Sequence, residues 1–499
     1  MSNVSVGSAN AAFVTPATGV LDAYNRRNNM HDASREFYKL LDDLQSPAVR
    51  DRLKRAKIGI AQTIEAFEKG YETDYVVIQL AMSMSPLSFR AVLSGTVAWQ
   101  AAKTTSLDWY SAAGPGVYAV GIGVNGRGGS FLSAQEIRRL AEGIDRYSAG
   151  YDALQTAAGQ RTSSQRQDVR YLRSVDNAIS NCVASAKGGR SIDNPSEQQR
   201  ALLFSERLRE RAQAIESVDP TGQTIQIQSP LYVGCSEKLE QRTRDYVAPV
   251  NLGNINKLLA LTLNVLKMMN LPSTLYVRPV IRIWERHQLP YAERLVATLA
   301  ESLVAQNGFN AREAGGQACP FNPNAFQTAK SVVFSVKPYL KRHIDGVDTV
   351  LKDRLKFIQE VKRLSQYLSD LQQEIDGTRQ QLRSLMALKP IGWTAGIAML
   401  QTKLQKLCQQ TDMLVDWKVR MQAVIGLQNA MLPPPPSAGH QSADSQPPLS
   451  ATEVRWVPAT PVAGQGRRPL PLSSSSVVTV IPQTSDSSSL PAIDEMDVD

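Results

Sequence analysis

The sequence predicts an α+β chain: a small three-stranded sheet with its helices, flanked by an N-terminal helical region and a C-terminal coiled coil or helical hairpin. Three observations predict this class. Apolar residues recur at helical spacing from residue 37 onward. Three short segments between residues 114 and 284 alternate as strands do. A heptad pattern then runs over residues 344–385.

The amino-acid composition excludes several classes of protein. With 499 residues and 42% hydrophobic side chains, the chain can bury a sizeable core, which excludes wholesale disorder. The four cysteines lie far apart without a CxxC pair, which argues against a disulfide scaffold, a zinc finger or a thioredoxin-type site. Neither a secretory signal nor a membrane span is expected, because Pro86 and Arg90 interrupt the longest apolar stretch. We therefore expect a nuclear or cytoplasmic protein, and its net charge of +9 favours a polyanionic partner.

The N-terminal third is expected to be helical. Residues 1–30 are small and polar and are predicted to be disordered, whereas residues 31–110 carry apolar positions at helical spacing. Pro86 marks a break within this helical region, because proline removes a backbone donor.

A strand, a turn and a helix follow, within a domain expected over residues 111–318. Residues 117–124 alternate between a bulky row that contains Tyr118 and a nearly bare row that contains Gly121. After a glycine-rich turn, Ser133 and Glu136 have the spacing of a capping box for the next helix.

The rest of this domain is predicted to contain an insertion, two more strands and further helices. Residues 149–220 are polar with sparse apolar positions, which indicates solvated helices that loop out of the core. Strands are predicted at residues 224–234 and 275–284, the latter at a sheet edge because of Pro279. A helix from Pro290 is expected to continue through Val304 and to end at Gly308.

The C-terminal part begins with heptads. Residues 340–430 are expected to form either an antiparallel hairpin within one chain or a coiled-coil dimer, because residues 389–392 break the pattern and a second apolar helix follows. Residues 431–499 are rich in Pro and Ser and are predicted to be disordered.

Several polar residues lie on the predicted strands or after them, at a spacing that favours a shared site. Arg242 lies ten residues after Tyr232, and Tyr246 lies one helical turn beyond Arg242, so that Arg242 and Tyr246 project from one helix face. Tyr118 precedes them on the first strand, and Glu293 and Asn310 follow on later elements. We expect that helix face to line a cleft.

This ordered set resembles the GIY-YIG nuclease superfamily, over residues 111–318. Gly116-Val117-Tyr118 stands where the family has GIY, and Tyr232-Val233-Gly234 where it has YIG. The resemblance further assigns Arg242 as the arginine of the first helix, Tyr246 as the residue that is often histidine or tyrosine, Glu293 as the metal-binding carboxylate and Asn310 as the terminal asparagine. The segments 117–129 and 283–316 also resemble a fungal branch of proteins.

The resemblance implies metal-dependent hydrolysis of nucleic-acid phosphodiesters, with DNA as the expected partner. Glu293 would ligate one Mg²⁺ or Mn²⁺, a hard cation that accepts a single carboxylate and retains several waters. Arg242 would stabilise charge on the phosphoryl oxygens. Tyr118 or Tyr232 would accept the proton of the attacking water or position that water, and proton acceptance requires a cation that favours the phenolate.

The chain departs from the family in the long insertion between its two motif strands. Such an insertion is tolerable, because loop-closure entropy rises by only about 0.6 kcal/mol per doubling of length. Since no zinc finger or similar DNA-binding module is recognisable, substrate choice would fall to the N-terminal helices or to the arginines of the insertion, which are Arg161, Arg166, Arg170 and Arg173.

Ordinary structural roles are the alternative for each residue. The tyrosines suit any strand, Arg242 and Glu293 suit a solvated helix surface, and Asn310 suits a turn. Two other functions therefore stay open: a catalytically inactive relative that binds nucleic acid or a protein, and a helical scaffold for a nucleoprotein complex that self-associates through residues 344–430. The glycines of residues 121–129 lack the GxxxxGK[ST] pattern of a phosphate loop, and the four histidines form no metal motif.

Overall fold

The central element is a three-stranded antiparallel sheet, which confirms the α+β class. The computed structural model describes residues 15–27, 30–72, 75–104, 108–179, 190–247, 255–315, 322–388 and 394–430. The strands are β1 (Gly116–Val124), β2 (Leu231–Ser236) and β3 (Ser273–Arg282). Their order is β2-β1-β3, so β1 pairs with both neighbours and β3 lies at an edge, as Pro279 predicted.

The second strand begins later than the sequence predicted. It was expected over residues 224–234, but β2 starts at Leu231, directly after Pro230. The preceding residues bond elsewhere: the Gln226 carbonyl accepts from Phe131 N–H at 2.7 Å, and Gln226 N–H donates to the Leu132 carbonyl at 3.2 Å. The proline therefore separates two differently paired segments.

The two faces of β1 enter different hydrophobic cores. The bulky row of β1, which includes Tyr118 and Val120, packs into one core, and Val117 and Ala119 pack into another on the opposite face. The bare row admits helix α8 (Val97–Lys103), because a Cβ on Gly121 would lie only 3.0 Å from the Ala98 nitrogen. The missing side chains thus allow close contact between helix and strand.

Helices make up most of the described residues 15–27, 30–72 and 75–104, including part of the stretch expected to be disordered. Helix α1 (Pro16–Arg27) forms because Ala17, Val20 and Tyr24 share one face and bury it, so the prediction of disorder was wrong for residues 15–27. Residues 1–14 lie outside the described residues. The next helices are α2 (Met30–Ser34), α3 (Phe37–Gln45), α4 (Pro47–Ala56), α5 (Ala61–Glu72), α6 (Val76–Ser83) and α7 (Pro86–Leu93).

In the described residues between β1 and β2, three main helices pack into the core. They are α9 (Ala134–Gln155), α10 (Ser163–Asp176) and α12 (Pro195–Glu216), with the short η3 (Ala158–Gln160) between the first two. The predicted capping box of α9 is present, since Ser133 and Glu136 exchange hydrogen bonds. Leu172 of α10 and Phe204 of α12 are buried in the same core as Tyr118. The expectation of solvated helices that loop out was therefore wrong for these inward faces.

Three helices accompany β2 and β3. They are α13 (Leu239–Val247), α14 (Lys257–Met268) and α15 (Gln288–Leu299). The last was predicted to continue through Val304, but it ends at Leu299 because Glu301 adopts a left-handed backbone with φ +46°. The chain then folds back in a tight loop, in which Leu303 forms a parallel bridge with Asn310.

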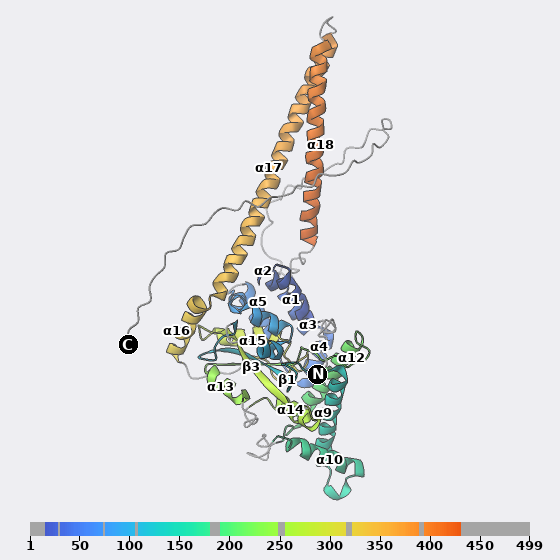
Figure 1. The fold of residues 1–499 in the computed structure, drawn as a ribbon, viewed down its shortest axis with the longest axis vertical. Helices are drawn as coiled ribbons and strands as arrows, with labels where there is room; N and C mark the ends of the chain where they lie inside the picture. Colours follow the sequence, from blue (N-terminus) through green and yellow to red (C-terminus); the bar gives the residue numbers. More distant parts are fainter. Residues whose placement is uncertain are drawn as a thin grey trace, which may run out of the picture. The chain divides into compact units, whose positions relative to one another are not determined.

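Two long helices complete the described chain after α16 (Pro323–Ser331) and the π-helical turn η5 (Val332–Val336). Helices α17 (Tyr339–Leu388) and α18 (Thr394–Ala430) lie side by side (Figure 1). Leu371 and Ile375 of α17 pack against Leu407 of α18. Within one chain the heptads thus form a hairpin, and the residues expected to be a disordered tail lie outside the described part.

A search of the described helices for membrane spans gave one bent pair. No single described helix is both long and apolar enough to cross a bilayer, and α6 with α7 passes only as a pair bent by 106°.

Candidate functional site

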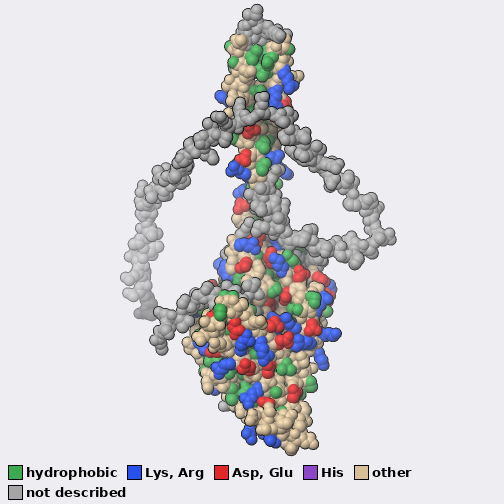
Figure 2. All heavy atoms as spheres, turned by 90° about the vertical axis from the view of Figure 1, so that its right-hand side faces the viewer, with side chains coloured by type: hydrophobic (Ala, Val, Ile, Leu, Met, Phe, Trp, Pro, Cys, Tyr) green, Lys and Arg blue, Asp and Glu red, His purple; other side chains and the backbone are tan. Residues whose placement is uncertain are grey.

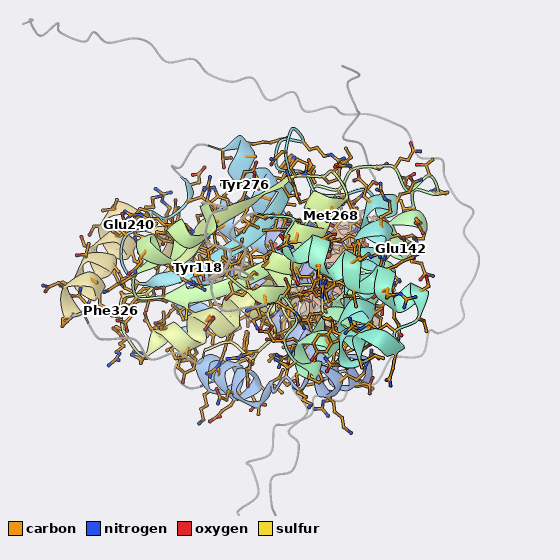
Figure 3. All side chains as sticks on the ribbon, turned by 90° about the horizontal axis from the view of Figure 1, so that it is seen from below. Tyr118, Glu142, Glu240, Met268, Tyr276 and Phe326 are labelled. Atoms are coloured by element: carbon orange, nitrogen blue, oxygen red, sulfur yellow. The ribbon has the colours of Figure 1, made fainter. Side chains whose placement is uncertain are left out.

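The first feature of the site is the pairing of the two motif strands. Tyr118 of β1 lies opposite Gly234 of β2 in the antiparallel register. A Cβ on Gly234 would lie 2.6 Å from the Tyr118 hydroxyl oxygen, closer than any real contact. Glycine at this position is therefore required by the ring of Tyr118, which is buried inside the fold (Figure 3).

Three tyrosines gather on this face of the sheet. The ring centroids of Tyr118 and Tyr246 are 5.6 Å apart, those of Tyr232 and Tyr246 are 6.0 Å apart, and those of Tyr118 and Tyr232 are 6.3 Å apart. The Tyr118 and Tyr246 hydroxyl oxygens are 3.3 Å apart. Tyr118 and Tyr246 are buried, whereas Tyr232 is partly exposed. Two motif strands and helix α13 thus supply one aromatic cluster.

Arg242 joins this cluster from α13. Its Nε donates to the Tyr118 hydroxyl at 3.2 Å, and its Nη2 donates to the Tyr246 hydroxyl at 3.4 Å. The guanidinium carbon also lies 5.3 Å from the centroid of the Tyr246 ring, within range of a cation–π contact. Arg242 and Tyr246 therefore share the helix face that their four-residue spacing predicted.

Burial determines the protonation of the three phenols. It raises the pKa of Tyr118, Tyr232 and Tyr246 above the usual value, although the charge of Arg242 acts in the opposite direction on each. The phenols are consequently neutral near pH 7, while the guanidinium keeps its charge. In this arrangement the hydroxyls orient Arg242 and can orient water, and they are poor general bases.

Glu293 lies near the cluster without contacting it. Its Oε2 accepts hydrogen bonds from the Cys235 thiol at 3.1 Å and from Gly315 N–H at 2.6 Å. Because strand side chains alternate, Cys235 faces the side of the sheet opposite Tyr232. Burial raises the pKa of Glu293. The pKa of Tyr232 is raised first by burial and further by the Glu293 charge, so the carboxylate acts on that phenol through space.

Asn310 lies at the outer edge of β2 and binds its backbone. Its Oδ1 accepts from Val233 N–H at 2.9 Å, and its Nδ2 donates to the Val233 carbonyl at 2.8 Å. The adjacent Phe309 N–H donates to the Leu231 carbonyl at 3.0 Å. Asn310 is buried, so its amide completes the hydrogen bonding of this strand edge and positions Tyr232 through the backbone.

The structure therefore unites part of the predicted set. Tyr118, Tyr232, Tyr246 and Arg242 form one cluster, whereas Glu293 and Asn310 reach β2 from its other face and its edge. The bond between Cys235 and Glu293 was not predicted from the sequence. The alternation of β2 could have indicated that Cys235 faces the later helix.

The single carboxylate of Glu293 suits a hard divalent cation. Oε2 of Glu293 accepts both hydrogen bonds described above, so Oε1 is the oxygen that would serve as a ligand. No group of three or more His, Cys, Asp or Glu side chains gathers as a metal site in the described ranges. A metal at Glu293 would therefore complete its coordination with water and substrate oxygens.

Comparisons with known proteins add no relative. Neither the protein-family models, nor the curated proteins, nor the solved structures include a match to this chain.

Proposed function

We propose that the chain is a GIY-YIG-like, metal-dependent endonuclease that hydrolyses nucleic-acid phosphodiester bonds, with DNA as the expected substrate. One observation carries the proposal: Tyr118, Tyr232 and Arg242 come from separate parts of the sequence and meet on paired strands and the helix that follows. Glu293 and Asn310 reach the same strand, β2. This placement supports the roles that the resemblance implies.

Arg242 would bind the scissile phosphate. The hydroxyls of Tyr118 and Tyr246 hold its guanidinium in place, which reduces the reorganisation needed when charge grows on the phosphoryl oxygens. Tyr232 is the most accessible of the three phenols, and as a neutral hydroxyl it would position the attacking water.

Glu293 would contribute Oε1 as a ligand, since Oε2 is held by Cys235 and Gly315. A bound Mg²⁺ or Mn²⁺ would supply stabilisation of charge on the leaving oxygen. Asn310 would act as a positioning residue, because its amide is committed to the backbone of Val233.

Nuclease assays with matched variants test this proposal. Plasmid, branched DNA and RNA are incubated with the full chain in Mg²⁺, Mn²⁺ or EDTA, beside Glu293→Gln and Arg242→Lys. We expect cleavage by the wild type to fall about 100-fold or more in both variants, as is typical when a group that stabilises transition-state charge is removed. Glu285→Gln is the control, since that glutamate is about half exposed in the loop before α15. Equal cleavage by wild type and Glu293→Gln, or none by either, refutes the proposal that the chain is an enzyme.

A catalytically inactive nucleic-acid-binding protein is the second candidate. The burial of Tyr118 and Tyr246 and the neutral state of all three phenols favour it, because such a cluster can be purely structural. On the face shown in Figure 2, Lys and Arg side chains are interspersed with Asp and Glu. Fluorescence anisotropy with a labelled oligonucleotide in EDTA separates the two candidates: binding without cleavage in any metal supports this one.

The third candidate is a helical scaffold that self-associates through residues 344–430. Its support is the row of exposed apolar side chains on α17, which includes Leu351, Leu355 and Ile358. Light scattering on the full chain and on a deletion of residues 344–430 tests it. An unchanged number of subunits after the deletion would exclude this route of assembly.

A further inference from the structure

A second basic site lies away from the tyrosine cluster, in a cavity of about 230 Å³. It is bounded by α12, by α14 and by the segment that follows Asn310. Three cationic side chains line it, one from each: Arg200, Lys257 and Arg312. The carboxylate of Glu197 lines it as well. Leu258 and Leu261 form the apolar part of the cavity wall.

Of these cations, Lys257 forms ion pairs with carboxylates, and the carboxylate of Glu197 also acts on Arg200 through space. Lys257 Nζ pairs with Asp193 Oδ2 and with Glu197 Oε1 at 3.0 Å. The other oxygen of Glu197 accepts from Asp193 N–H at 2.8 Å, so both of its oxygens are engaged. In the part of the chain that the structure describes, no carboxylate pairs with Arg200 or Arg312.

Arg200 is held in place through its Nε. Its Nε donates to the Ala56 carbonyl of α4 at 3.1 Å, which fixes the plane of the guanidinium. Burial lowers the pKa of Arg200, the nearby charge of Arg312 lowers it further, and the carboxylate of Glu197 acts in the opposite direction. Two guanidinium groups that repel each other across a cavity are stabilised by an anion between them. Guanidinium donors fit phosphate oxygens especially well, because two parallel N–H groups match two oxygens.

The segment that carries Arg312 also touches the candidate active site. Asn310, two residues before Arg312, clamps β2, and Gly315, three residues after it, donates to Glu293. A nucleic-acid strand at Glu293 would therefore lie beside the same segment that forms one wall of the cavity.

We propose that this cavity binds a backbone phosphate of a nucleic-acid strand, with Arg200 and Arg312 as paired donors. The proposal rests on the proposed function in that it takes nucleic acid as the partner, and it requires no catalysis. It gives the polar segment between the two motif strands a role in substrate binding, through α12.

Equilibrium binding tests it independently of cleavage. A fluorescein-labelled single-stranded DNA oligonucleotide is titrated with the full chain in EDTA at several salt concentrations. We expect Arg200→Gln and Arg312→Gln each to weaken binding about tenfold or more and to lower the salt dependence by about one counterion. Arg383→Gln, which removes an exposed charge on α17 outside the cavity, should bind as the wild type does.

A second pair of variants guards against misfolding. Arg312 is exposed, so its substitution should leave the circular dichroism spectrum and melting temperature unchanged even if Arg200→Gln does not fold. Ala311 is partly buried against the core, so the melting temperature of each Ala311 variant is measured beside its binding. Ala311→Glu would place a competing carboxylate at the cavity and should weaken binding at least as much as Arg312→Gln, whereas Ala311→Gln should not.

The outcomes divide clearly. Wild-type affinity in Arg312→Gln and Ala311→Glu overturns the proposal, as does failure of the wild type to bind the oligonucleotide. A calorimetric titration with inorganic phosphate distinguishes the source: phosphate binding that depends on Arg312, with unchanged oligonucleotide affinity, also overturns it. Binding that is lost in these variants supports the cavity even if no cleavage is found, a result that would refute the nuclease alone.

Discussion

The clamp between Asn310 and β2 gives the most direct test of how this site is built. Replacing Asn310 by alanine removes both hydrogen bonds to Val233 and leaves a buried N–H and a buried carbonyl without their partner. Each such loss costs about 1–3 kcal/mol. We therefore expect Asn310→Ala to lower the free energy of unfolding by about 2–6 kcal/mol.

Urea unfolding followed by tryptophan fluorescence measures this loss. Asn25→Ala is the matched control, because Asn25 also accepts a hydrogen bond, from Arg90 Nε at 2.9 Å, but at an exposed position. That control should change the free energy of unfolding by less than about 0.5 kcal/mol. The slope of the transition should be the same in both variants if only stability changes.

Asn310→Asp sharpens the test. An aspartate keeps an acceptor for Val233 N–H but places its second oxygen against the Val233 carbonyl oxygen, where Nδ2 now donates. We expect at least the loss seen for alanine at pH 7, with partial recovery at pH 4.5 as the carboxyl group protonates. An Asn310→Ala protein as stable as Asn25→Ala would refute the clamp. A fully stable Asn310→Ala protein with altered cleavage would indicate that Asn310 takes part directly in the reaction.

Three further changes have expected outcomes. Gly234→Ala should cost about 1–3 kcal/mol in urea unfolding, because its methyl group would displace the buried Tyr118 ring. Burial lowers the pKa of His343, whose Nδ1 lies 2.7 Å from the Met82 carbonyl oxygen. As the pH falls, the unfolded chain binds a proton at this histidine before the folded chain does. The stability of the folded protein is therefore unaffected by His343 above about pH 6.5 and decreases below it, which melting curves at pH 7.5 and 5.5 will show. Leu371→Ala should destabilise the hairpin by about 2 kcal/mol or more, measured as loss of helical circular dichroism on heating.

Each of these has its own control. Gly19→Ala adds a methyl group where no atom lies within 4 Å and should be neutral or stabilising, so an equal cost at both glycines would remove the steric explanation. His343→Gln should flatten the decline between pH 7.5 and 5.5, and an unchanged slope would assign the decline to other groups. Leu355→Ala changes an exposed leucine of the same helix, so a loss as large as that of Leu371→Ala would contradict the packing of the hairpin.

Local patterns predicted the elements of the fold well where the signal lies within a few residues. Strand β1, the capping box of α9 and the shared helix face of Arg242 and Tyr246 all follow from alternation or helical spacing. The end of α15 could not be predicted this way. Apolar residues continue at helical spacing to Val304, but the helix ends because Glu301 turns back and accepts a hydrogen bond from Ala17 N–H, which lies far away in the sequence.

The candidate site was predictable to a similar degree. Spacing indicated that Arg242 and Tyr246 lie together, and strand pairing brought Tyr118 and Tyr232 to them. The bond between Glu293 and Cys235 depends on how α15 packs against β2, and no short-range pattern encodes that. Proton acceptance by a phenol was expected to require a nearby cation. Arg242 lies beside Tyr118, but burial has the larger effect on the pKa of this phenol.

The helices between β1 and β2 have a consequence for any attempt to shorten this protein. An insertion that merely loops out could be cut away and its ends joined by a few residues. Here, excising the stretch from Ala134 to Glu216 would strip one wall from the core that holds Tyr118 and would leave its apolar side chains facing water. A minimal folded fragment of this chain must therefore retain α9 and α12.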